Sequence, residues 1–137
     1  MNYSIEKNEQ YALIRLNESD FDGEVAPTFD TLSRTLFREG YSNIIVDMDV
    51  TQTIDDDAIT VVRKINRQCT SEDGLMIVVT KNEEIIDELD LSNIPDLTIL
   101  PTVEEAVDAV FMNDLENDFR NEDDSQHDGG SGRESDY

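Results

Sequence analysis

The sequence NIIVDMDVTQTIDDDAI at residues 43–59 joins a strand pattern to a helix pattern through a polar loop. The run Ile44–Val46 is short, apolar and β-branched, as is typical of a buried strand in an α/β protein. Apolar residues then recur at helical spacing, at Ile59, Val62, Ile65 and Cys69. This spacing predicts a helix over residues 57–71. The stretch therefore predicts a strand–loop–helix unit, with three consecutive carboxylates where its helix begins.

The same alternation continues toward the C-terminus. Leu75–Thr80 and Leu97–Leu100 are apolar runs that predict two further buried strands. Between them, Asn82 is placed to cap a short helix. Thr102 followed by Glu105 matches a capping box and predicts the start of a last helix.

Two strands precede the first helix on the N-terminal side. Tyr3–Lys7 and Tyr11–Leu16 are separated by three polar residues, a length suited to a hairpin. Apolar residues at helical spacing then predict a helix over residues 26–39, and Gly40 follows as a C-terminal cap. The predicted order is ββαβαβαβα, which indicates an α/β fold with a mixed, mostly parallel sheet.

The charge of the chain is strongly negative. Its 137 residues include 33 acidic and 10 basic side chains, a net charge of −23. From Asn113 onward there are nine acidic and two basic residues, so residues 1–112 carry 24 acidic and 8 basic ones, a net −16. Such a field repels nucleic acid and anionic lipid and favours basic partners. We therefore expect no nucleic-acid or membrane ligand.

The composition changes near residue 113. Residues 1–112 alternate apolar and amphipathic segments and are expected to form one domain, whereas residues 113–137 form an acidic tail. From Asn121 the tail has too little apolar surface to offset the entropy of ordering, so we expect most of it to be disordered. We expect the tail to act as a solvating extension, as a contact for a basic partner surface, or as an autoinhibitory strip over Arg63, Lys64 and Arg67.

No segment predicts secretion or a membrane span. The N-terminus lacks a basic region followed by an apolar one, and the longest apolar runs are only a few residues long. The single cysteine, Cys69, cannot form an intramolecular disulfide, which fits a reducing compartment. Because it lies on the apolar face of a predicted helix, we interpret Cys69 as a packing residue. A soluble cytoplasmic protein is expected.

The element order, together with the 43–59 stretch, resembles the STAS domain of bacterial anti-sigma-factor antagonists. The resemblance covers residues 3–112. In that family a loop reading apolar-Asp-Ser-Ser/Thr-Gly-Leu opens the helix after the buried strand, and a partner kinase phosphorylates the residue before the glycine. Here Ile54-Asp55-Asp56-Asp57-Ala58-Ile59 occupies that place. Asp55 matches the family's Asp, Asp57 stands at the phosphoacceptor position, and Ala58 replaces the glycine.

Two interpretations of the Asp-Asp-Asp loop remain open. Unpaired backbone N–H groups and the helix dipole favour negative charge at a helix start, so these carboxylates serve as a cap and as first-turn charges. Alternatively, Asp57 is a fixed partial substitute for phosphoserine, with one negative charge where phosphoserine carries about −1.5 to −2.

The resemblance implies a non-enzymatic interaction module in signalling or transcription regulation. The expected contact surface is the switch loop formed by Thr53, Ile54, Asp55, Asp56, Asp57 and Ala58, with Arg63 and Lys64 as its rim. The implied partner is a protein, either an anti-sigma factor of the serine-kinase type or another STAS protein. A STAS module that only acts as a scaffold is the alternative.

Enzymatic and phosphoaspartyl functions fit the sequence less well. No Gly-rich phosphate loop, catalytic triad or Cys/His cluster is present in residues 1–112, so we expect no catalytic residue, no metal and no cofactor. His127, the only histidine, lies in the tail. A receiver domain is a second alternative, because Asp47, the Asp55–Asp57 run and Lys81 resemble an acidic pocket with its lysine. In a receiver domain, however, the acidic pair follows the first strand and the phosphoacceptor follows a later one. Here Asp47 and Asp55–Asp57 all follow one strand, Ile44–Val46.

Overall fold

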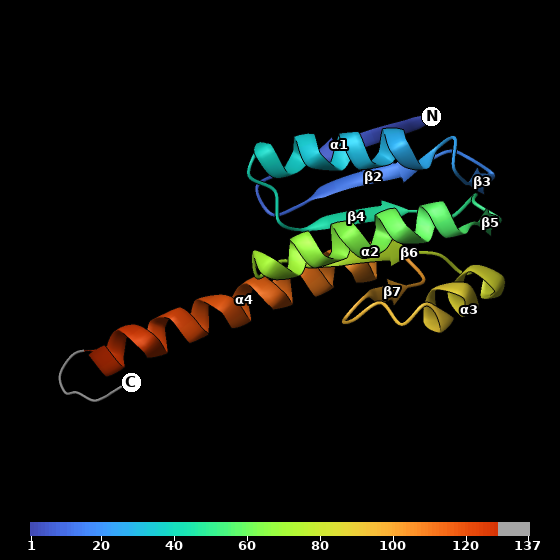
Figure 1. Ribbon diagram of the computed structural model, residues 1–137. Helices are drawn as coiled ribbons and strands as arrows, with labels where there is room; N and C mark the ends of the chain where they lie inside the picture. The colour runs from blue at the N-terminus through green and yellow to red at the C-terminus, as the bar shows by residue number, and fades with distance from the viewer. Residues whose placement is uncertain (129–137) are drawn as a thin grey trace.

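The computed structural model describes the backbone of residues 1–128 and the side chains of residues 1–120. Its main sheet has five strands in the order β1-β2-β4-β6-β7 (Figure 1). Their bounds are β1 Tyr3–Lys7, β2 Ala12–Leu16, β4 Ile44–Asp47, β6 Met76–Val79 and β7 Thr98–Leu100. β1 pairs antiparallel with β2, and all the other neighbours are parallel. The predicted mixed, mostly parallel sheet is therefore confirmed.

Helices cover both faces of this sheet. Their bounds are α1 Ala26–Arg38, α2 Asp56–Ser71, α3 Glu83–Leu91 and α4 Val103–Asp128. On one face, alternate strand residues such as Ile14 and Val46 pack in a core with α1, α2 and α3. On the other face, Leu13 and Ile45 pack against Ala106 of α4. Because both faces are buried, the central strands read as continuous apolar runs.

A second, two-stranded parallel sheet lies beyond the end of the main one. It pairs β3 (Asp20–Phe21) with β5 (Thr53–Ile54). Sequence patterns predicted a polar loop where β5 lies and no strand where β3 lies, so the predicted set of strands was incomplete. Strands of two residues are too short to produce a period-2 pattern, and their pairing joins positions 33 residues apart, which local reasoning does not detect.

The last helix extends beyond the apolar residues from which it was predicted. α4 continues past residue 113 to Asp128 without a break in its backbone. Residues 103–128 contain neither glycine nor proline, the two residues that most often end a helix, and Gly129-Gly130 follows directly. The backbone of residues 121–128 is helical, and the disorder expected for most of the tail stays a prediction. Residues 129–137 lie outside the described residues, and a division into domain and tail at residue 113 stays a prediction.

Candidate functional site

The three carboxylates of the switch loop stand at the start of α2. Asp55 is the N-cap residue, in extended conformation, and its Oδ1 accepts a hydrogen bond from the Ala58 amide at 3.0 Å. Asp56 and Asp57 form the first two positions of the helix, and all three side chains are exposed. This is the capping geometry that the sequence predicts. Ala58 is fully buried, so its methyl group packs into the core in place of the family's glycine.

The β3–β5 ribbon holds the switch loop in place. The Gln52 amide donates to the Ser19 carbonyl at 2.7 Å, and the Asp55 amide donates to the Phe21 carbonyl at 3.1 Å. The buried hydroxyl of Thr51 donates to the Glu18 carbonyl at 2.7 Å. These bonds tie the loop at Thr51, Gln52 and Asp55 to the segment of residues 18–21 before any partner arrives, so the loop is preorganised.

Gly23 brings a second segment against the switch loop. Its amide donates to Oδ2 of Asp55 at 3.1 Å, so Asp55 joins the start of α2 to the segment before α1. A Cβ atom on Gly23 would lie 2.6 Å from Oδ2 of Asp57, closer than a side chain allows. Glycine at position 23 therefore lets the Asp57 carboxylate lie against the backbone. No local pattern pointed to this contact, although the Asp22-Gly23-Glu24 sequence marks a turn.

Carboxylates from the two segments form one surface at the end of the ribbon. We call it the acidic loop surface, and its members are Asp20, Asp22, Glu24, Asp55, Asp56 and Asp57. All are exposed except Asp22, which is half-buried. The five ion pairs found in residues 1–120 involve none of them, so no basic side chain neutralises this charge. Val50, 54% exposed, lies just before the ribbon in the chain.

The predicted rim residues point to neighbouring helices. Arg63 donates from Nη2 to the Ser92 carbonyl at the end of α3, at 2.7 Å. Lys64 pairs with Asp30 of α1 at 3.1 Å. Arg63 and Lys64 lie about 9 and about 10.5 Å along α2 from Asp57, given a rise of about 1.5 Å per residue. They connect helices in this structure, and a role at the rim of a contact surface remains a prediction.

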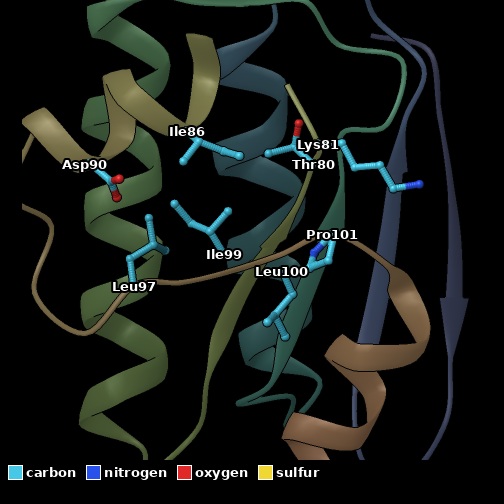
Figure 2. A pocket seen from close by; sticks show the side chains of 8 residues that line it. All are labelled: Thr80, Lys81, Ile86, Asp90, Leu97, Ile99, Leu100 and Pro101. Atoms are coloured by element: carbon cyan, nitrogen blue, oxygen red, sulfur yellow. The ribbon is translucent and has the colours of Figure 1, made fainter. Parts of the chain in front are cut away.

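A hollow beside α3 is lined by none of the residues of the acidic loop surface. It is an open cavity of about 540 Å³ between α3 and β7. Figure 2 shows Ile86, Leu97 and Ile99 gathered around it, while the amino group of Lys81 points away from them. In residues 1–120, no group of three His, Cys, Asp or Glu side chains is arranged to hold a metal ion. Burial raises the pKa of Cys69 to about 12, which keeps this thiol protonated.

The sequence matches a known domain family, and the fold matches solved structures. The model of the STAS domain family matches residues 2–106. An anti-sigma factor antagonist from Mycobacterium paratuberculosis superimposes with a TM-score of 0.70 at 14% identity, over 80% of this chain and 92% of that one. The phosphorylated form of the Bacillus cell fate determinant SpoIIAA gives 0.64 at 19% identity, over 80% and 99%.

The fold also occurs inside a much larger protein. The murine anion transporter Slc26a9 superimposes with a TM-score of 0.61 at 12% identity, over 78% of this chain but 18% of the transporter. No curated protein sequence matches at a significant level. In the part of the chain that the structure describes, no helix is both long and apolar enough to cross a membrane. At these identities the likeness to solved structures concerns the fold.

Proposed function

Because the chain belongs to the STAS domain family, we propose that it acts by binding another protein through its acidic loop surface. Membership of this family, with a sheet that opens on an antiparallel hairpin, argues against the receiver alternative. The observation that carries the proposal is a preorganised loop whose carboxylates are exposed and have no basic partner among residues 1–120. Such a surface is complementary to a basic one.

The proposed partner is a regulator of the anti-sigma-factor type with a basic contact face. Two solved structures with this fold are described as an anti-sigma factor antagonist and as a cell fate determinant in a phosphorylated form. Asp57 provides a permanent negative charge at the position that corresponds to the phosphoacceptor. A kinase that modifies hydroxyl groups has no substrate at this position, so the loop stays charged and selects a partner that accepts it.

The position of Asp57 in its helix does not by itself distinguish it from other acidic residues of the chain. Glu84 of α3 and Glu104 of α4 occupy the same second position of their helices, and the helix dipole favours each of them equally. What sets Asp57 apart is its approach to Gly23 and its place within the acidic loop surface. This comparison supplies a matched control, because Glu84→Ser removes one exposed charge from the first turn of another helix.

The test is an affinity pull-down from the source cells with quantitative mass spectrometry. Wild-type protein, Asp57→Ser and Glu84→Ser are compared side by side. We expect one anti-sigma regulator to be enriched by wild type and by Glu84→Ser, and to be recovered about fivefold less with Asp57→Ser. Equal recovery with both variants would exclude a role for the acidic loop. Increased recovery with Asp57→Ser would show instead that the charge of Asp57 repels the partner.

A further inference from the structure

Helix α4 changes the direction of its apolar face after Val110. Up to that residue its apolar side packs on the sheet, and Ala106 and Val110 are fully buried. In the next two turns the side facing the domain is polar. Asn113 and Asn117 both donate to the Asp73 carbonyl at 2.9 Å, and Asn43 donates to Asp114 at 3.4 Å. This part of α4 is therefore attached to the domain by polar contacts.

The apolar residues of the same two turns face away from the domain. They are Phe111, Met112, Leu115 and Phe119, which are 42%, 58%, 52% and 65% exposed. We call them the outer stripe. At about 100° per residue they lie on one side of the helix, roughly opposite Asn113, Asp114 and Asn117. Their spacings of three and four residues make them neighbours along the helix surface.

Packing among residues 1–120 leaves each side chain of this stripe more than 40% exposed. Figure 1 shows α4 extending past the ends of the strands, with no other element beside its projecting part. Single exposed apolar residues are ordinary, but a continuous row of large ones on a helix is typical of a surface that a partner covers. Anchors spaced four residues apart, as Phe111, Leu115 and Phe119 are, suit a helix that lies in an apolar groove.

The charges beside the outer stripe indicate what covers it. Exposed Glu116 and Asp118 flank it on either side, and exposed Asp108 precedes it by one turn. Arg120, the one basic residue among residues 103–120, donates to Asn117 on the side of the helix that faces the domain. A second copy of the helix would bring these carboxylates close to identical ones, and like charges across an interface cost affinity. An anionic membrane surface would be repelled in the same way. A groove rimmed by Lys and Arg would satisfy both the apolar and the acidic side chains.

We propose that the projecting part of α4 is a second docking element, which inserts the outer stripe into an apolar, basic-rimmed groove of another protein. This surface is separate from the acidic loop surface and does not depend on the function proposed for it. The two are separable by experiment, because Asp57→Ser leaves the outer stripe intact.

The test uses two dye-labelled amphipathic peptides of equal length, one built from Leu and Lys and the other from Leu and Glu. Their binding to the full chain is measured by fluorescence anisotropy at physiological ionic strength. The test variant is Phe111→Gln/Leu115→Gln/Phe119→Gln, which keeps every charge and uses a good helix former. The control variant, Tyr3→Gln/Leu91→Gln, removes exposed apolar side chains elsewhere. Circular dichroism verifies that both variants are folded.

We expect the Leu/Lys peptide to bind wild type, Asp57→Ser and the control variant alike, and the test variant at least about tenfold more weakly. The Leu/Glu peptide is expected to bind none of them. Undiminished binding of the Leu/Lys peptide to the test variant would show attraction by charge alone and overturn the proposal. The proposal would also be overturned if wild type sedimented as a dimer and the test variant as a monomer. A second copy of the chain would then be what covers the outer stripe.

Discussion

Asp55 uses both oxygens of its carboxylate, one for the Ala58 amide of α2 and the other for the Gly23 amide. Loss of an N-cap side chain costs about 0.5–2 kcal/mol. We therefore expect Asp55→Ala to lower the free energy of unfolding by about 1–2 kcal/mol in urea titrations. Asp55→Asn keeps an oxygen acceptor and should lose less.

Asp56→Ala is the matched control for this prediction. It removes an exposed carboxylate one residue further on, where no side-chain hydrogen bond is formed. Equal destabilisation by Asp55→Ala and Asp56→Ala would show that the negative charge at the helix start stabilises the protein and that the capping hydrogen bonds of Asp55 do not. A larger loss in Asp55→Ala assigns the difference to the two hydrogen bonds.

Cys69 is the residue whose protonation the fold changes most clearly. It is fully buried on α2, and burial raises its pKa from 9.0 to about 12. Only the thiolate reacts with disulfide reagents, so at pH 8 the reactive fraction falls by about a thousandfold relative to an unperturbed thiol. We expect a chromogenic disulfide reagent to label native protein very slowly at pH 8 and urea-unfolded protein rapidly.

The same shift has a consequence for stability. Because the pKa is higher in the folded state, the neutral thiol contributes its full stabilisation below about pH 9, and that contribution is lost as the pH rises toward 12. Fast labelling of the native protein between pH 7 and 9 would contradict a buried, protonated Cys69. Cys69→Ala is the control for labelling at any other site.

The β3–β5 ribbon is the element that fixes the acidic loop surface. Thr51 is 1% exposed, and its hydroxyl is bonded to the Glu18 carbonyl. Thr51→Val keeps the shape of the side chain but leaves that carbonyl without this donor, at a cost of about 1–3 kcal/mol. We expect the amides of Gln52 and Asp55 to exchange with solvent at least about fivefold faster in this variant, as measured by hydrogen-exchange NMR.

Thr60→Val is the control for the ribbon. The Thr60 hydroxyl bonds to the Asp56 carbonyl within α2, on an exposed face, so its loss should leave exchange in the ribbon unchanged. If the amides of Gln52 and Asp55 exchange at the wild-type rate in both variants, the Thr51 hydrogen bond is not needed to keep the loop ordered.

The elements that sequence patterns predict are those whose signal is local. The five strands of the main sheet begin and end within one residue of their predicted bounds. The central strands β2, β4 and β6 are predictable because their apolar runs are buried on both faces, whereas the exposed edge strand β1 is predictable from the short polar turn that follows it. The Asp55 cap is likewise local, since it joins residues three apart. The contact of Gly23 with Asp55 is not a local signal, because it depends on the pairing of Phe21 with Ile54 between distant segments. The outer stripe is visible in the sequence, but only the fold shows that it faces away from the domain.

At the scale of the whole molecule, the two proposed surfaces lie at opposite ends. The acidic loop surface follows the carboxyl end of β4, beside β3 and β5, whereas the projecting part of α4 is attached near Asp73, just before β6 begins (Figure 1). A partner bound at one end would leave the other free. The two proposals together predict that one domain can hold two proteins at once, each with a basic contact face.

Charge repulsion across the molecule opposes this compact fold. Five ion pairs stabilise residues 1–120, but 33 acidic residues face only 10 basic ones in the chain. Salt screens both effects, with a Debye length of about 30 Å at 0.01 M and about 8 Å at 0.15 M. Because repulsion extends over the whole surface and exposed ion pairs contribute little, we expect added NaCl to raise the midpoint of thermal unfolding by several degrees.

The control separates screening from other effects of salt. Neutral sucrose at the same osmolality stabilises by exclusion from the protein surface and does not screen charge. A variant with four exposed acidic residues replaced by neutral ones, Glu9→Gln, Asp87→Asn, Glu88→Gln and Asp90→Asn, should show a higher midpoint at low salt and a smaller gain from NaCl. All four lie outside the ion pairs and outside the first turns of the helices, where the helix dipole favours acidic residues. A midpoint that falls as NaCl is added would mean that the ion pairs, chiefly Arg15 with Glu6 and Asp47, outweigh the repulsion.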